Sequence, residues 1–195
     1  LSSFKSVGNF VNVFTKKFDK LDILINNAGC INDILKFTED NLEMTIQANH
    51  ISHVLLTGLL LNFLGKSEDP RIVNVGSVAH SFVDNELDYF KFDENNNKWI
   101  KNYGLSKAGN IFHTENLVVF CKKYSHLKNV LSLCPHPGSV YTDILRTEGM
   151  NFFLKYFVKI FGYNFMFLFI KTEYIGAKCN LHFCYSKRDK LLNGG

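Results

Sequence analysis

Short apolar runs alternate along the chain with longer stretches of helical spacing. Before the first run, apolar residues recur every three or four positions from Phe4 to Phe18, which predicts an amphipathic helix. The runs are β-rich and almost continuously apolar, as is typical of strands buried on both faces. They cover residues 21–26, 71–75 and 130–134. Strands and helices that alternate in this order predict an α/β fold with a doubly wound, mostly parallel sheet.

Two long helices are predicted between these strands. Residues 39–64 are expected to form one continuous helix with an acidic first turn, Thr38 as its N-cap and Gly65 at its end. Residues 101–123 are expected to form the second helix, after an acidic, Asn-rich segment at 84–98. Right-handed crossovers would bring the carboxyl ends of the strands, and any ligand, to one edge of the sheet.

Composition narrows the class of protein. The chain has 195 residues, 46% hydrophobic and 21% charged, which fits one soluble globular domain or a large piece of one. Its five cysteines form no Cys-x-x-Cys pair, and this favours free thiols in a reducing, intracellular location. Cys179, His182 and Cys184 lie close together without a second ligand pair, so no metal site is predicted.

Charge is unevenly distributed along the chain. The net charge is −4 over residues 1–100 and +8 over residues 101–195. A basic half can favour an anionic membrane surface or a phosphate-bearing ligand. On charge alone we interpret these lysines as solvent-exposed residues on helix faces. No nucleic-acid partner is predicted.

The two ends of the chain are unusual for a nucleotide-binding α/β fold. Such a fold normally opens with a strand, a glycine-rich turn and a helix. Here the chain begins on a helix, no Gly-x-x-x-Gly-x-Gly segment precedes it, and residues 192–195 form no evident cap or polar tail. We therefore expect the sequence to be cut at both ends, with the N-terminal strands missing.

A Tyr-x-x-x-Lys pair is the first candidate for chemistry, because its two side chains share one face of a helix. The spacing occurs three times, so the spacing alone proves nothing. Only Tyr103 follows a strand that ends in a Ser-bearing turn, at Ser77, and only its helix continues through small residues at 106–109. The other two pairs are Tyr124/Lys128 and Tyr174/Lys178.

Acid–base chemistry is what such a pair can carry. A tyrosine has a reference pKa of about 10, and a nearby ammonium favours the phenolate and moves that pKa toward neutral pH. Tyr103 beside Lys107 is then expected to deliver or remove the proton of an alcohol/carbonyl pair, while Ser77 hydrogen-bonds the same oxygen. Asn49 stands in mid-helix, where its poor helix propensity needs a reason.

Five segments, taken in order, form a highly specific set although each alone is weak. They are LDILINNAG (21–29), QANHISHVLLTGLLL (47–61), RIVNVGSVAH (71–80), YGLSKAGNIF (103–112) and HPGSVYTDI (136–144). With this set the chain resembles the short-chain dehydrogenase/reductase family and, within it, the retinol dehydrogenase group. The resemblance implies a Rossmann-type sheet and a single, partial domain over residues 1–195.

Roles for individual residues also follow from the resemblance. Tyr103 would be the acid/base, Lys107 would lower its pKa and hold the nicotinamide ribose, Ser77 would orient the substrate oxygen, and Asn49 would hold a water for proton relay. Besides Tyr103 and Lys107, the cofactor would contact Asn27, Ala28 and Gly29 on its adenosine side, and Pro137, Gly138, Val140 and Thr142 on its nicotinamide side. The resemblance favours NADP slightly over NAD.

Residues 151–170 hold seven Phe in twenty positions. Two lysines near the middle argue against a membrane span, and with Asn151 they make one narrow polar stripe on a broadly apolar predicted helix. Because the segment after Pro137-Gly138 is a lid in the resembled fold, we interpret residues 143–171 as an apolar substrate lid. Its 151–170 part would touch a membrane surface. A packed core or dimer helix is the open alternative.

Together these features predict an oxidoreductase that moves a hydride between a nicotinamide cofactor and a hydrophobic alcohol or carbonyl, retinol-like or another lipid. Its location would be cytoplasmic or peripheral on the endoplasmic reticulum membrane, with a homodimer as an option. The alternative is a non-catalytic remnant or interaction module that cannot bind the dinucleotide, since no glycine-rich turn is present. Against that alternative, all four tetrad residues are in place.

Overall fold

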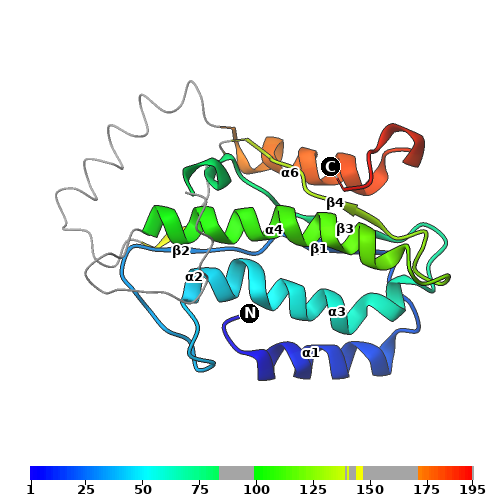
Figure 1. Ribbon diagram of the computed structural model, residues 1–195, viewed down its shortest axis with the longest axis horizontal. Helices are drawn as coiled ribbons and strands as arrows, with labels where there is room; N and C mark the ends of the chain where they lie inside the picture. The colour runs from blue at the N-terminus through cyan, green and yellow to red at the C-terminus, as the bar shows by residue number, and fades with distance from the viewer. Residues whose placement is uncertain (84–98, 139, 141–143, 147–170, 195) are drawn as a thin grey trace.

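A three-stranded parallel sheet forms the centre of the protein (Figure 1). Its strands β1 (Ile23–Asn26), β3 (Arg71–Asn74) and β4 (Leu131–Leu133) lie in the order β1-β3-β4, in parallel register. These strands confirm the three predicted from apolar runs. The computed structural model describes residues 1–83, 99–138, 140, 144–146 and 171–194.

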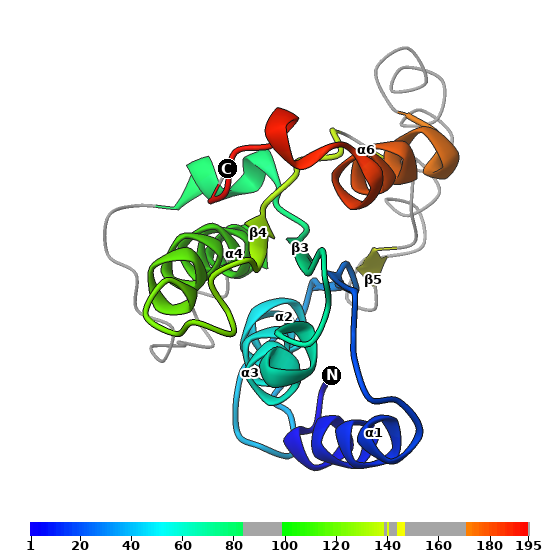
Figure 2. The ribbon, with the colours of Figure 1, turned by 90° about the vertical axis from the view of Figure 1, so that its right-hand side faces the viewer.

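Helices cover both faces of this sheet, which confirms the doubly wound arrangement (Figure 2). On one face lie α1 (Phe4–Lys17), α3 (Ser52–Leu64) and α4 (Trp99–Cys121), and on the other lies α6 (Glu173–Tyr185). The first face buries a core of Val11, Leu24, Leu60, Leu61, Leu64, Ile72, Leu117, Cys121, Leu127 and Val130. The second buries Val73, Leu131, Leu133 and Cys184.

Burial on both faces holds for two of the three strands. Every residue of β3 and β4 is buried. In β1, however, Ile25 is 43% exposed although its neighbours Leu24 and Asn26 are buried. The apolar run over residues 21–26 therefore predicted the strand correctly but overstated how deeply it is covered.

The helix predicted over residues 39–64 begins later than expected. It starts with α2 (Met44–Ile46), where the Glu43 carboxylate caps the helix by accepting from the Ile46 backbone N–H at 2.8 Å. It then passes through a π-helical turn, η1 (Gln47–Ile51), into α3. Gly65 closes α3, as expected, with its N–H donating to the Leu61 carbonyl at 3.0 Å.

The acidic pair before this helix caps a different helix. The Asp40 carboxylate accepts from the Phe4 backbone N–H at 2.8 Å, and Glu39 accepts from the Ser3 hydroxyl. Both carboxylates therefore lie at the positive N-terminal end of α1, where anions are favourable. Thr38, the expected N-cap, instead donates its hydroxyl to the Gln47 side chain.

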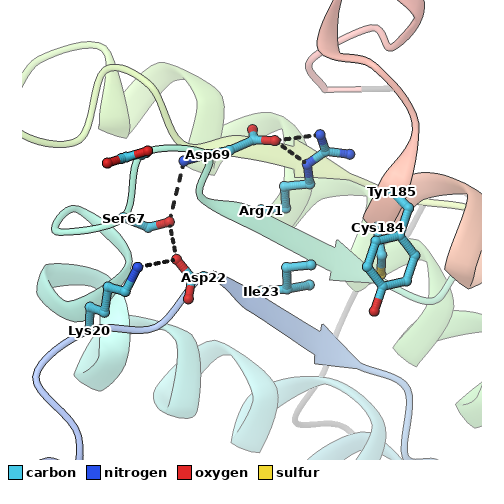
Figure 3. Close-up of a pocket in the computed structure, with 9 residues that line it drawn as sticks. Lys20, Asp22, Ile23, Ser67, Asp69, Arg71, Cys184 and Tyr185 are labelled. Atoms are coloured by element: carbon cyan, nitrogen blue, oxygen red, sulfur yellow. Dashed lines mark hydrogen bonds and ion pairs between the residues drawn. The ribbon is translucent and has the colours of Figure 1, made fainter.

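An ion pair between Asp69 and Arg71 lies at the amino end of the sheet, beside the C-terminal end of α6 (Figure 3). Arg71 begins β3 and is only 4% exposed. Its guanidinium donates twice to Asp69, through Nε at 3.2 Å and Nη2 at 2.6 Å, and once to the Phe183 carbonyl at 3.0 Å. Arg188 donates to the other Asp69 oxygen at 2.7 Å. Asp69 and Arg71 line a pocket of about 350 Å³, and the bond from Arg71 to Phe183 holds the C-terminal end of α6 against the strands.

Short elements complete the described part of the chain. A second parallel pair joins β2 (Ile31–Asn32) to β5 (Leu145–Arg146), and 3₁₀ turns η2 and η4 cover Val78–Phe82 and Arg188–Lys190. Among the described residues, no helix is both long and apolar enough to cross a membrane. Residue 142, the segment 151–170 and most of the predicted lid at 143–171 lie outside the described residues, so those predictions stay predictions.

Candidate active site

A cleft of about 680 Å³ opens at the carboxyl ends of the strands, where the sequence places the ligand. The turns after β1, β3 and β4 meet there with the start of α4 and one side of α6. Nine of the predicted site residues line it, namely Asn27, Ala28, Gly29, Ser77, Tyr103, Lys107, Pro137, Gly138 and Val140. Asn49 is not among its lining residues, and Thr142 lies outside the described residues.

Tyr103 and Ser77 are brought together by the packing of η2 on α4. Ser77 is extended and caps η2, where its hydroxyl accepts from the Ala79 backbone N–H at 3.2 Å. A Cβ on Gly104 would lie 2.5 Å from the Ala79 carbonyl oxygen, so the glycine beside Tyr103 is what lets the two elements approach. Both side chains therefore line the same cleft, and the Ser77 hydroxyl is near enough to the Tyr103 phenol to lower its pKa.

Lys107 lies beneath this pair, almost fully buried. It is 3% exposed, and its Nζ donates to the Val75 carbonyl at 2.9 Å. Burial lowers the pKa of Lys107 to about 8. Its ammonium lies 5.6 Å from the centre of the Tyr103 ring. The i, i+4 spacing thus does place both side chains on one face of α4, toward the cleft.

The pKa of Tyr103 differs from the expectation drawn from sequence. Burial raises this pKa above its ordinary value, and the hydrogen bond from Ser77 opposes the rise only in part. The structure does not show the lowering of this pKa that we expected from the Lys107 ammonium. At neutral pH Tyr103 is therefore protonated, which equips it to donate a proton.

Asn49 braces the cleft from behind. Its amide bridges the Cys30 backbone, with Oδ1 accepting from the N–H and Nδ2 donating to the carbonyl, each at 2.8 Å. A third bond runs from Nδ2 to the Ser106 hydroxyl at 3.3 Å. A Cβ on Gly29 would lie 3.3 Å from Asn49 Oδ1, so this bracing fits tightly under the turn at 27–29. These bonds supply the reason for an asparagine within a π-helical turn.

A ladder of buried amides and hydroxyls ties the strand ends to the helices. Asn26 Nδ2 donates to Asn74 Oδ1 at 2.7 Å and to the Thr57 hydroxyl at 2.9 Å. Asn74 Nδ2 in turn donates to the Thr114 hydroxyl at 2.9 Å. The first Asn of the Asn-Asn-Ala-Gly turn therefore links β1 to β3 through side chains.

The turn after β4 depends on a glycine in the left-handed region. Gly138 has a φ of +85°, and a Cβ there would lie 2.9 Å from Lys171 Nζ. Lys171 Nζ donates to the Pro137 carbonyl at 3.2 Å, and Val140 pairs with Lys171 in a parallel bridge. The Pro-Gly turn and the start of α6 thus form one wall of the cleft.

Sequence reasoning missed the contribution of α6. It adds Glu173, Gly176, Ala177 and Asn180 to the cleft, and Asn180 Nδ2 donates to Asn27 Oδ1 at 3.2 Å. Asn180 Oδ1 is buried and has no hydrogen-bond partner among the described residues. The one available signal was Thr172, which caps α6 in front of an acidic first turn. His136 also lines the cleft, and nothing in the sequence singled it out.

Comparison with known proteins agrees with this geometry. A family profile described as short chain dehydrogenase matches residues 1–89. Retinol dehydrogenase 11 of Homo sapiens is 34% identical over all of this chain, which covers 57% of that protein. The chain belongs to the short-chain dehydrogenase family. Retinol dehydrogenase 14 of Homo sapiens is 32% identical, again over the whole chain and 55% of the relative.

A solved structure supports the fold. An uncharacterised protein from Mycobacterium paratuberculosis matches with a TM-score of 0.60 and 27% identity, over 73% of this chain and 50% of that one. The predicted resemblance to the retinol dehydrogenase group is confirmed, since these relatives match across the full chain. The chain spans a little over half the length of the curated relatives it matches.

The described residues of this short-chain dehydrogenase fit a nicotinamide dinucleotide. The turns that carry Gly29 and Gly138 line the carboxyl edge of the sheet, where ligands of this fold bind. Lys107 supplies a buried cation beside Tyr103, and Asn180 supplies an unpartnered amide oxygen. A hydrogen-bond donor and a free acceptor at this edge suit a polar ligand that is rich in hydroxyl groups.

Proposed function

We propose that this protein is an NAD(P)-dependent oxidoreductase that interconverts a hydrophobic alcohol and its carbonyl compound. The observation that carries the proposal is the convergence of the Ser77 and Tyr103 side chains on one cleft, with Lys107, almost fully buried, beneath the tyrosine. An acid and a hydroxyl that converge on one point are what a carbonyl oxygen needs in order to be held and protonated.

The chemistry would divide between cofactor and chain. When bound, the nicotinamide supplies or accepts the hydride. In the reductive direction Tyr103 gives its Oη proton to the substrate oxygen, and in the oxidative direction the phenolate takes that proton back. Ser77 Oγ donates to the same oxygen and holds its position. Lys107 stabilises the phenolate left on Tyr103 and holds the ribose. Asn49 fixes the turn at 27–29, and a proton relay through it stays a prediction.

Substrate and cofactor preference are inferred more indirectly. The names of the relatives and the Phe-rich composition of residues 151–170 support a retinoid-like or other lipid substrate under an apolar lid at 143–171. NADP is proposed over NAD on the same family grounds. We propose a peripheral membrane contact through 151–170, on the endoplasmic reticulum. If a Phe165→Ser/Phe167→Ser variant co-sediments with liposomes as strongly as the unsubstituted protein, the proposed membrane contact is wrong.

Substitution of Tyr103 tests the reaction itself. Tyr103→Phe keeps the ring and removes the proton, so turnover of a hydrophobic aldehyde with a reduced nicotinamide cofactor should fall by about 10²–10⁴-fold. Tyr174→Phe is the matched control, since Tyr174 shares the Tyr-x-x-x-Lys spacing but is 72% exposed. Normal turnover in Tyr103→Phe would overturn the proposed function.

A further inference from the structure

A second group of buried polar side chains lies behind Lys107, away from the cleft lining. The Val75 carbonyl oxygen accepts from Lys107 Nζ at 2.9 Å and also from Asn110 Nδ2 at 3.2 Å. Both side chains are almost fully buried, with Asn110 2% exposed. The lysine and the asparagine, nearly one helical turn apart on α4, therefore share a single acceptor.

This shared acceptor fixes the orientation of the Asn110 amide. Its nitrogen must face the Val75 carbonyl, because an amide oxygen there would meet another acceptor. Asn110 Oδ1 then points at His50 Nδ1, 3.1 Å away. Since Oδ1 can only accept, His50 must carry its proton on Nδ1. Burial lowers the pKa of His50, which keeps the imidazole neutral near pH 7.

The backbone is shaped to bring His50 to this place. His50 belongs to the π-helical turn η1 and packs against α4 at Gly109. A Cβ on Gly109 would lie 2.8 Å from the imidazole Cδ2 and Nε2, which leaves no room for any larger residue without a shift. A π-helical turn on one element and a glycine on the other thus both serve a contact that the cleft itself does not use.

We propose that His50 and Asn110 are positioning residues for Lys107. The imidazole holds the Asn110 amide in the one orientation in which it shares the Val75 carbonyl with the lysine, and so fixes where the ammonium stands beneath Tyr103. The inference rests on the proposed dehydrogenase function. It concerns the protein side of the site, and none of these contacts involves the cofactor.

Two substitutions at His50 separate the hydrogen bond from the ring. His50→Phe keeps a ring but loses the donor, and kcat should fall about tenfold with little change in the KM of the hydrophobic substrate. His50→Asn loses the ring but can place an amide N–H where Nδ1 was, and it should recover most of that loss. Thermal unfolding is expected in the opposite order, because Asn leaves the larger cavity.

Controls distinguish this inference from the function on which it rests. His126→Phe is matched, because His126 makes a similar contact with Asn62 at 3.2 Å on the exposed surface, and kcat should not change. If Tyr103→Phe abolishes turnover while His50→Phe and His50→Asn have equal kcat, the positioning role is wrong and the function stands. If Tyr103→Phe keeps its turnover, the proposed function itself is wrong, whatever the His50 variants show.

One spectroscopic measurement needs no substitution. Nitrogen NMR of the protein labelled at histidine reports the tautomer of each imidazole. We expect the His50 signals to show a neutral ring protonated on Nδ1 at pH 7. A ring protonated on Nε2 instead would break the chain from His50 to Lys107 and overturn the proposal, even if His50→Phe does not fold.

Discussion

The ammonium of Lys107 lies 5.6 Å from the centre of the Tyr103 ring, and only 3% of the lysine is exposed. The Tyr174/Lys178 pair on α6 has the same spacing and an even closer approach of 4.7 Å, yet Tyr174 is 72% exposed. What distinguishes the candidate catalytic pair is thus burial at a strand end, which changes the pKa of both its members.

A buried cation of this kind costs stability, and removing it should increase stability. Burial lowers the pKa of Lys107 from 10.5 to about 8, which corresponds to about 3 kcal/mol against the charged form in the fold. Lys107→Met relieves that cost but gives up the bond to Val75, worth about 1 kcal/mol. We expect the free energy of unfolding at pH 7 to rise by about 2 kcal/mol while turnover is lost.

Denaturant unfolding followed by circular dichroism measures this change. Lys178→Met on the exposed pair is the control, and it should alter neither stability nor turnover. A Lys107→Met protein less stable than the unsubstituted one would mean that the ammonium stabilises the fold, contrary to the burial argument.

The rate of carbonyl reduction should depend on pH through the same lysine. The pKa of Lys107 is lowered to about 8. Most of the ammonium is therefore present at pH 7, and it is lost as the pH rises through that value. Without it the phenolate left on Tyr103 after proton donation is less stabilised. Reductive kcat is therefore expected to fall above about pH 8. Initial rates between pH 6 and 10 would locate the step.

Lys107→Arg supplies the comparison for this profile. A guanidinium stays charged over the whole range, so the remaining activity should lose the step near pH 8. If the step persists unchanged in Lys107→Arg, another group titrates there and the assignment to Lys107 is wrong.

Much of the fold followed from sequence pattern because its strands are continuous apolar runs. The exception was the start of the helix after residue 38. Thr38, Glu39 and Asp40 are good capping residues, but their side chains bond to the following helix and to α1, and Glu43 caps instead. Which of several capping residues is used depends on tertiary contacts that local sequence does not contain.

Site residues on turns were easier to predict than those on helices that pack from elsewhere. Ser77 and the turn at 27–29 directly follow strands, and parallel topology brings strand ends together. Asn180 reaches the same cleft from α6, 153 positions from its partner Asn27, and the Thr172 cap of α6 is the one local signal for it. The raised pKa of Tyr103 was likewise missed, because burial is not visible in the spacing of two residues.

Glycine-to-alanine substitutions in helices should change stability in opposite directions, depending on what the new Cβ would contact. A Cβ on Gly109 would meet the His50 ring at 2.8 Å, whereas a Cβ on Gly8 of α1 would meet nothing within 4 Å. Gly109→Ala should destabilise the protein by about 1–3 kcal/mol through overpacking, and Gly8→Ala should stabilise it by about 0.5–1 kcal/mol through helix propensity. Thermal unfolding of the two variants should shift in opposite directions, and a shared direction would contradict the close packing of His50.

The network at the amino end of the sheet should matter for stability and not for turnover. Asp69 is the carboxylate that pairs buried Arg71, and it also accepts from Arg188. Asp69→Ala removes these charged hydrogen bonds and leaves the Phe183 carbonyl as a remaining partner of Arg71, so we expect a loss of about 1.5–3 kcal/mol. Arg71 and Arg188 hold the pKa of Asp69 below its ordinary value, so this contribution should disappear as the pH falls through that lowered pKa.

Glu68→Ala next door is the control, since Glu68 is exposed, and it should change stability little. Equal unfolding midpoints for Asp69→Ala and Glu68→Ala would show that Arg71 does not need its carboxylate.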